Sequence, residues 1–256
     1  MDLERFAGVA RCYGTRGLEN FTQSRVAVVG VGGVGSWVAE SLARSGIGAI
    51  DLIDLDDLCV SNTNRQLPAL LGHYGDNKAQ AVADRIAQIN PACQVQAIQD
   101  FVTPDNAAHY LQGLTACIDA CDTLKAKEAM VWAARRQKLP LFVSGAAGGQ
   151  IDPSQVQSAD LARVIQDPLL AKLRRQLRKS GLSGDKKMGV RCVFSTEQPR
   201  YTAPDGGTQS MRHPDAVGGL DCGGGLGASM AVTTAFAMQL TALCLAHLSR
   251  ARLAEV

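Results

Sequence analysis

The sequence predicts an α/β protein with a Rossmann-like, doubly wound and mostly parallel sheet, extended at its C-terminal end by further strands and an apolar helix. Short strand-like runs alternate with helical patterns between residues 25 and 195, as expected for strands joined by crossover helices. The first run is followed by the glycine spacing G-x-G-x-x-G, and the second run ends in acidic residues. This order is typical of a nucleotide-binding unit.

The individual elements follow from local patterns and their stop signals. Strands are expected at residues 26–29, 49–55, 94–97, 116–119, 141–146 and 190–195. Helical periodicity predicts helices at residues 36–45, 78–89, 104–111, 125–138 and 167–179. Gly46 marks the end of the first helix and Asn90-Pro91 the end of the second, because glycine favours a helix C-terminus and proline disfavours a helical residue before it.

The glycine turn after the first strand predicts an anion site. Gly30 permits the tight turn, Gly32 lets the backbone approach a phosphate, and Gly35 lets the next helix pack on the strand, with Gly33 between them. The free N–H groups at the start of that helix point toward an anion. Asp54 follows about 20 residues later, where such units bind ribose hydroxyls. Up to this point, a nicotinamide cofactor and ATP fit equally well.

Polar and basic residues after the second strand favour ATP. Asn62, Asn64 and Arg65 lie in a polar segment, and Lys78 begins the next helix. A dehydrogenase has little use for such cations beside its diphosphate, whereas nucleotidyl transfer develops charge on the α-phosphate and on the departing pyrophosphate. Arg supplies a planar donor fork and Lys a point charge for that task. The alternative is a solvated surface loop.

Two carboxylates, Asp119 and Asp122, follow the fourth strand, at the edge of the sheet where ligands bind. They suit Mg²⁺, a hard cation that prefers oxygen ligands and bridges to phosphates, and Asp122 is the favoured metal ligand. The alternative is that Asp122 only caps the helix that follows it.

The second half of the chain carries a basic segment, residues 167–191, although the net charge of the 256-residue chain is only +2. Such a stripe is a candidate contact for a polyanion backbone, and the alternative is a solvated helix face. A Gly-, Pro- and Thr-rich stretch at 198–219 predicts a mobile loop. The candidate residues for this polyanion contact are Lys172, Arg174, Arg175, Arg178, Lys179, Lys186 and Lys187.

The stretch Gly223–Leu248 has no Asp, Glu, Lys or Arg and is long enough to span a membrane. Its glycines, threonines and few leucines make it only mildly apolar, so a buried core or dimer-interface helix is expected instead. The N-terminal residues carry charges early and lack the apolar region of a signal peptide. Eight scattered cysteines without a C-x-x-C pair predict reduced thiols, a cytoplasmic location and no zinc site.

Several motifs in order resemble the ubiquitin-activating-like adenylating superfamily, which includes enzymes of molybdopterin and thiamine biosynthesis. They are VVGVGGVGS, Asp54-Leu-Asp56, Asn62-Thr-Asn64-Arg65-Gln66, Lys78 and Asp119-x-x-Asp122. The resemblance implies that the site binds ATP with Mg²⁺ and adenylates a carboxylate. It assigns Asp54 to the ribose, Asp122 to the metal, and Asn62, Arg65 and Lys78 to the phosphates. The implied catalytic residues are Arg65, Lys78 and Asp122, and the implied ATP site is Gly30, Gly32, Gly33, Gly35, Asp54, Asp56, Asn62, Arg65, Gln66, Lys78, Asp119 and Asp122.

Further motifs, among them ARCYG, DFVTPDN, GGQIDPSQ, GVRCVFSTE and DCGGGLGA, resemble the branch of this superfamily that acts on tRNA. This implies ATP-dependent dehydration of threonylcarbamoyladenosine next to the anticodon. The threonyl carboxylate is adenylated, and an intramolecular ring closure releases AMP. The resemblance also implies a homodimer, and it leaves a structural monovalent cation and a cysteine desulfurase partner open. A DNA partner is not expected.

One adenylating domain is therefore expected over residues 1–256. It comprises an N-terminal arm (1–24), a nucleotide-binding core (25–147) and a tRNA, substrate and dimer part (148–256). Arg5 or Arg11 of the arm is a candidate to act across the dimer, and Cys222 or Cys192 is a candidate for a thiol role. The alternative function is adenylating activation of a small ubiquitin-like sulfur-carrier protein. A nicotinamide-dependent oxidoreductase or a non-catalytic tRNA-binding module fits the residues less well.

Overall fold

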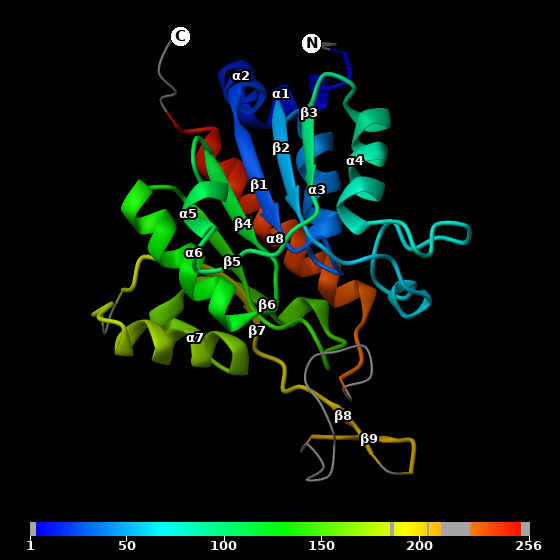
Figure 1. Ribbon diagram of the computed structural model, residues 1–256, viewed down its shortest axis with the longest axis vertical. Helices are drawn as coiled ribbons and strands as arrows, with labels where there is room; N and C mark the ends of the chain where they lie inside the picture. Colours follow the sequence, from blue (N-terminus) through cyan, green and yellow to red (C-terminus); the bar gives the residue numbers. More distant parts are fainter. Residues whose placement is uncertain (1–3, 185–186, 204, 211–225, 252–256) are drawn as a thin grey trace.

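A seven-stranded sheet forms the centre of the computed structural model, which describes residues 4–184, 187–203, 205–210 and 226–251. The strand order is β3-β2-β1-β4-β5-β7-β6, and only β6 runs antiparallel to its neighbour (Figure 1). The predicted Rossmann-like, mostly parallel sheet is confirmed. The strands are β1 (Arg25–Val29), β2 (Ala49–Ile53), β3 (Gln94–Ile98), β4 (Ala116–Asp119), β5 (Leu141–Ser144), β6 (Val156–Asp160) and β7 (Arg191–Ser195).

Helices cover both faces of this sheet. On one face α3 (Gly35–Arg44) packs against α4 (Lys78–Ile89) and α8 (Met230–Leu248). On the other, α6 (Leu124–Gln137) packs against α5 (Ala107–Tyr110) and α7 (Pro168–Lys179). The N-terminal segment folds into two further helices, α1 (Ala7–Tyr13) and α2 (Thr15–Gln23).

The glycine turn is as tight as its spacing predicts. Gly30 has φ +83°, and a Cβ added to it would lie 2.8 Å from the backbone nitrogen of Cys121. A Cβ on Gly35 would lie 1.8 Å from the carbonyl oxygen of Gly30. The first residue of α3 must therefore be glycine for the helix to begin directly beside the turn.

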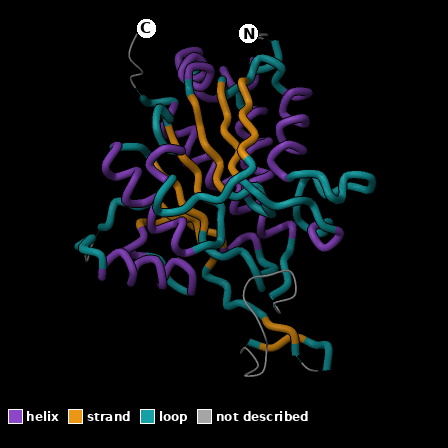
Figure 2. The backbone as a smooth tube through the Cα atoms, in the orientation of Figure 1, coloured by secondary structure: helices purple, strands orange, loops and turns teal. Residues whose placement is uncertain are grey.

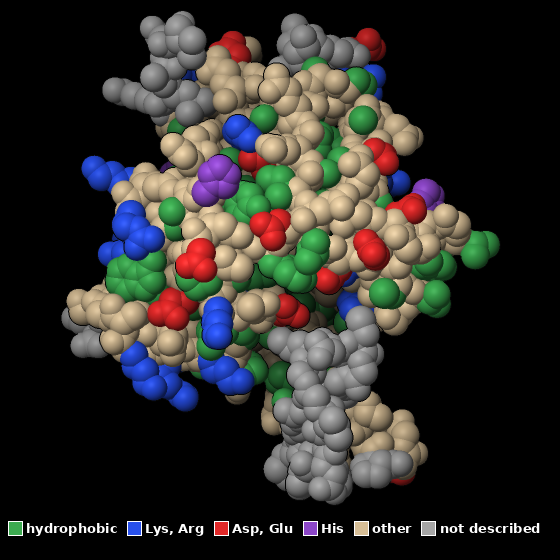
Figure 3. Space-filling view, in the orientation of Figure 1, with side chains coloured by type: hydrophobic (Ala, Val, Ile, Leu, Met, Phe, Trp, Pro, Cys, Tyr) green, Lys and Arg blue, Asp and Glu red, His purple; other side chains and the backbone are tan. Residues whose placement is uncertain are grey.

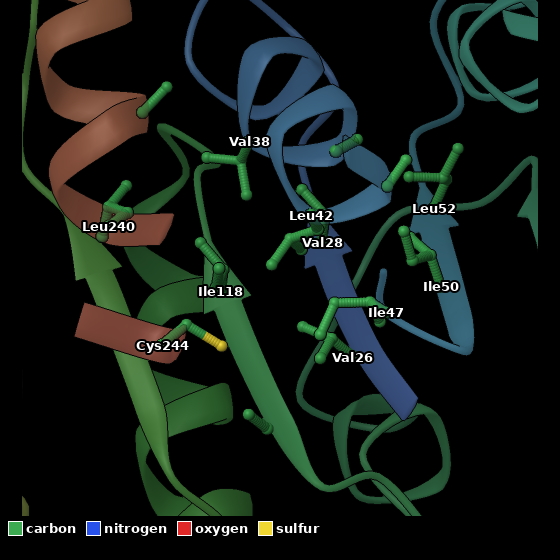
Figure 4. Close-up of a cluster of buried hydrophobic side chains, with 14 of the residues drawn as sticks. Val26, Val28, Val38, Leu42, Ile47, Ile50, Leu52, Ile118, Leu240 and Cys244 are labelled. Carbon is green, nitrogen blue, oxygen red and sulfur yellow. The ribbon is translucent and has the colours of Figure 1, made fainter. Parts of the chain in front are cut away.

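The apolar stretch near the C-terminus forms a core helix, α8, within the described residues; residues 223–225 lie outside them. Its buried side chains include Leu240 and Cys244, which face Val38 of α3 and Ile118 of β4 across the cluster in Figure 4. By length and hydropathy (mean 1.5) α8 is apolar enough to cross a membrane, but half of that window is buried inside the protein. A helix that forms part of the core meets the same criterion as a membrane span.

The N-terminal arm is packed onto this core. Asn20 of α2 donates from Nδ2 to the carbonyl oxygens of Leu248 (3.1 Å) and Ala251 (2.9 Å) at the end of α8. Arg5 donates to the carbonyl of Ile89 in α4, and Arg11 is exposed. These contacts place the arm at the edge of the sheet where the strands begin.

Two parts of the fold differ from the expectation. The antiparallel strand β6 was not predicted, because its sequence VQSAD is polar and is recognised as a strand only through its ladder with β7. The described part of the expected mobile loop contains a small hairpin, β8 (Tyr201–Thr202) and β9 (Thr208–Gln209). Residues 204 and 211–219 of that loop lie outside the described residues.

Candidate active site

The carboxyl ends of β1, β2, β4 and β5 open into a cavity of about 950 Å³, called here the catalytic cavity. The loops that follow these strands gather at this edge of the sheet (Figure 2). The catalytic cavity brings together most of the residues predicted for the ATP site: Gly30, Gly32, Gly33, Asp54, Asp56, Asn62, Arg65, Gln66, Lys78 and Asp122. Gly35 and Asp119 do not line it.

Asp54 holds the glycine turn in place. Its Oδ2 accepts a hydrogen bond from the backbone N–H of Val31 at 2.6 Å, and its Oδ1 accepts from that of Asp56 at 2.9 Å. Only 8% of the residue is exposed, and this burial raises the pKa of Asp54 above its ordinary value. The two backbone hydrogen bonds and the charge of Lys78 oppose that shift. Each oxygen keeps further acceptor capacity for a ligand hydroxyl.

Lys78 is a buried cation with one acidic partner. Its Nζ lies 2.8 Å from Oδ2 of Asp56, and only 9% of its side chain is exposed, against 56% for Asp56. It is the first residue of α4, where the helix dipole disfavours a positive charge, so the carboxylate of Asp56 offsets an unfavourable position. An ammonium held this way retains donors that an arriving anion can accept.

Arg65 lies over the glycine turn. A Cβ on Gly33 would come within 3.1 Å of its Cγ, so the turn leaves just enough room for the arginine stem. Its Nη1 donates to the carbonyl of Ser61 (3.0 Å) and to Oδ1 of Asn64 (2.9 Å). Its own carbonyl accepts from Nε1 of Trp37 at 3.0 Å, which fixes the backbone. The guanidinium keeps other N–H groups for an anion.

Two polar side chains complete this wall. Asn62 is 2% exposed, and its Oδ1 accepts from the backbone N–H of Cys59 at 3.0 Å, closing the short turn that carries it. Gln66 is also buried, and its Oε1 has no hydrogen-bond partner among the described residues. A buried amide oxygen without a partner is uncommon, and it marks a place where a ligand or water donates.

Asp122 lies exposed on the cavity wall between β4 and α6. The alternative that it caps α6 is wrong: the residue at the N-cap is Thr123, and no side chain caps this helix. The described residues contain no group of three or more His, Cys, Asp or Glu that could hold a metal ion by themselves. One carboxylate facing a phosphate pocket nevertheless fits Mg²⁺, which takes one or two protein carboxylates and completes its shell with phosphates and water.

Asp119 does not face the cavity, contrary to the expectation. It is fully buried, and its Oδ1 accepts from Nζ of Lys127 at 3.0 Å. Asp119 is the last residue of β4, and its carboxylate points into the protein. Asp122 lies three residues further along, in the loop after β4, and lines the cavity. Spacing along the sequence could not separate these two roles.

The cavity also uses residues that the sequence did not assign to it. Asp100 and Phe101 come from the loop after β3, and Lys125 from the first turn of α6. Thr233 of α8 and residues 226–228 before it lie outside the core expected at 25–147, and Nδ2 of Asn64 donates to the carbonyl of Ala228. The motif DFVTPDN was the signal for the first pair and DCGGGLGA the signal for residues 226–228, whereas nothing local marked Lys125 or Thr233.

The remaining predicted residues lie away from this cavity. Arg174 is tied to its own chain, with Nη1 donating to the carbonyls of Leu161 (3.0 Å) and Val164 (2.8 Å), so it is not a free surface cation. Lys172, Arg175, Arg178, Lys179 and Lys187 are exposed. Cys192 is fully buried, and burial raises the pKa of its thiol, which is the reverse of what a reactive cysteine requires. Lys186 and Cys222 lie outside the described residues.

The fold and the cavity together define an α/β protein of the Rossmann-like, nucleotide-binding class, with two cations and an exposed carboxylate around its glycine turn. The model of the ThiF family matches residues 5–251, so the chain belongs to the ThiF family. This confirms the resemblance found in the sequence.

Individual relatives agree with that assignment. The chain is 50% identical over 238 residues to the tRNA threonylcarbamoyladenosine dehydratase of Escherichia coli (strain K12), covering 91% of this chain and 89% of that protein. Two solved structures of the E. coli enzyme, TcdA, one in complex with ATP and one with AMP, each match with a TM-score of 0.85 and 46% identity. Each match covers 97% of this chain and 96% of the other.

Proposed function

We propose that the chain is an ATP-dependent dehydratase of threonylcarbamoyladenosine in tRNA. The observation that carries the proposal is the catalytic cavity, which places Arg65, Lys78 and an uncommitted carboxylate, Asp122, around the glycine turn. The similarity to dehydratases that bind ATP and AMP supports it. The domain is proposed to act as one unit, with residues 148–256 contributing to the tRNA and dimer surfaces.

The proposed reaction begins with attack of the threonyl carboxylate on the α-phosphate of ATP, which releases pyrophosphate. Arg65 and Lys78 stabilise the charge that develops on the phosphates, and Asp54 accepts from the ribose. Asn62 and Gln66 orient the nucleotide from the same wall. Mg²⁺, when bound, would offset phosphate charge, and Asp122 would hold it.

A nitrogen of the same threonylcarbamoyl side chain then attacks the acyl-adenylate carbon, and AMP leaves. Because this step is intramolecular, positioning supplies much of its rate. A protein nucleophile is not required, in agreement with the raised thiol pKa values of Cys121, which lines the cavity, and of the buried Cys192. In this proposal neither cysteine acts.

In the same proposal, the tRNA substrate binds the exposed cations of α7. The protein forms a homodimer, is located in the cytoplasm and has a cysteine desulfurase system as partner. The half-buried α8 supports the location, since this helix forms part of the protein core. Family resemblance supports the dimer, the desulfurase partner and a structural monovalent cation.

The direct test is to incubate the protein with ATP, Mg²⁺ and tRNA bearing threonylcarbamoyladenosine. The masses of the nucleosides are then measured by mass spectrometry after mild digestion. Loss of one water from that nucleoside with equimolar AMP is expected. An unchanged nucleoside, together with pyrophosphate exchange that depends on a small carrier protein, would overturn the proposal and favour carrier activation.

A further inference from the structure

A second cavity, of about 880 Å³, lies at the opposite edge of the sheet from the catalytic cavity. We call it the distal cavity. Its walls come from the start of β5 and β7 and from the ends of α6 and α8. β5 connects the two, because it begins at Leu141 in the distal cavity and ends at Ser144 in the catalytic cavity.

The distal cavity is strongly basic. Four cations line it, and no Asp or Glu is found among its described lining residues: the cations are Arg135, Lys138, Arg191 and Arg250. None of the four forms an ion pair with a carboxylate in the described part of the chain. Asp160, which is paired with Arg191 across the β6–β7 ladder, instead accepts from the backbone N–H groups of Met188 and Gly189.

Helix dipoles do not account for this charge. Arg135 and Lys138 lie at the C-terminal end of α6, and Arg250 follows the end of α8, where cations are ordinarily favourable. Two helix ends supply roughly half a negative charge each, about one in total, against four positive charges. A surplus of about three positive charges therefore remains, on four side chains that are all exposed to solvent; one of them, Arg135, also donates to the carbonyl of Met188.

The floor of the distal cavity is apolar and aromatic. The rings of Phe142 and His247 meet edge to face with centroids 6.3 Å apart, beside Leu243 and Val131. Proteins hold nucleic-acid strands with cations that bind phosphates and rings that contact bases or sugars. Here His247 is the exposed ring, whereas Phe142 is buried in the core. An isolated phosphate would leave most of this volume empty.

α6 runs between the two cavities and carries cations at both ends, with the acidic Glu128 between them. α6 carries Lys125 at the rim of the catalytic cavity and ends beside Lys138 in the distal cavity, and its 14 residues span about 21 Å. α7 packs along it, with Nε1 of Trp132 donating to Oγ of Ser180. Figure 3 shows Lys and Arg side chains over α6 and α7, with Asp and Glu side chains between them.

We propose that the distal cavity binds the phosphodiester backbone of the tRNA whose modified adenosine occupies the catalytic cavity. The identity of the RNA rests on the proposed function; the anion chemistry rests on the residues above. The site differs from the exposed face of α7, since its cations belong to α6, β7 and the segment after α8.

The test compares two double variants in tRNA binding at several salt concentrations. In Lys138→Gln/Arg191→Gln, two phosphate contacts are lost. The plot of the logarithm of the association constant against log salt should therefore become less steep by about one to two, and binding should weaken on the order of ten-fold. The control Arg16→Gln/Arg163→Gln removes two exposed cations that do not line the distal cavity and should match the wild type. ATP–pyrophosphate exchange should stay unchanged in both, because neither pair lines the catalytic cavity.

Equal tRNA binding by the two double variants would overturn the proposal. It would also be overturned if the variants of the distal cavity lost binding of inorganic pyrophosphate while their tRNA slope stayed at the wild-type value, since the cavity would then hold a free anion. The binding measurement uses unmodified tRNA, so it stays informative even if the dehydration test fails.

Discussion

The ammonium of Lys127 lies 3.0 Å from Oδ1 of Asp119 and 2.9 Å from the carbonyl oxygen of Ser144, with both charged side chains fully buried. Burial alone would lower the pKa of Lys127, but the neighbouring carboxylate outweighs it and raises that pKa. The pair ties the end of β4 to the end of β5 and to α6. The loops that follow both strands line the catalytic cavity, so this pair fixes the positions of the strand ends from which those loops begin.

Removing the cation of this pair should be strongly destabilising. Lys127→Met leaves the carboxylate of Asp119 buried without a counter-charge, and the free energy of unfolding is expected to fall by about 3–5 kcal/mol in urea titrations. The double variant Lys127→Met/Asp119→Asn removes both charges and should recover part of the loss. A single variant as stable as the wild type would show that the pair does not support the fold.

Asp122 should affect chemistry and not stability. Because this carboxylate is exposed and caps no helix, Asp122→Asn is expected to unfold within about 0.5 kcal/mol of the wild type. AMP formation should fall on the order of a hundred-fold, and the Mg²⁺ concentration for half-maximal rate should rise. Wild-type turnover with an unchanged Mg²⁺ dependence would contradict the assignment of this residue to the metal.

The space under Arg65 gives a test that leaves every polar group in place. In Gly33→Ala the new methyl would lie 3.1–3.2 Å from Cγ and Cδ of Arg65 and push the guanidinium outward. The KM for ATP is expected to rise several-fold, by about 1 kcal/mol of binding. Gly8→Ala, where nothing lies within 4 Å of the new methyl, is the control and should leave KM unchanged; its stability should rise by about 0.5–1 kcal/mol, because Gly8 lies in α1 and alanine favours a helix. Equal kinetics in both variants would remove Arg65 from the nucleotide site.

The raised pKa of Asp54 determines the direction in which its contribution to stability changes with pH. Between the ordinary value, 3.8, and the raised value in the folded state, the native protein binds more protons than the unfolded chain. Stability from this group is therefore fully present below the unfolded pKa and declines as the pH rises through the folded pKa. Asp54→Asn should remove that decline, so the stability of the wild type relative to the variant should fall with rising pH in denaturant titrations. A difference that rises or stays constant would contradict the shift.

Much of the fold was predictable because its signals are local. The buried strand at 26–29, the glycine spacing and the helix from Lys78 to Ile89 each depend on residues close in sequence, and the structure places them as expected. The cavity residues that follow these signals, such as Lys78 and Asp122, could be found for the same reason. The carboxyl ends of parallel strands meet at one edge of the sheet.

Other features depend on partners distant in the chain. The sequence by itself determined the sheet class, the glycine turn and several residues that line the catalytic cavity, since hydrophobic periodicity and backbone sterics act over a few residues. Only the tertiary structure decided that Asp119 turns inward to Lys127, that Arg174 binds its own backbone and that Thr233 of α8 joins the cavity. Burial and ion pairing depend on which segments pack together, and no local pattern encodes that choice.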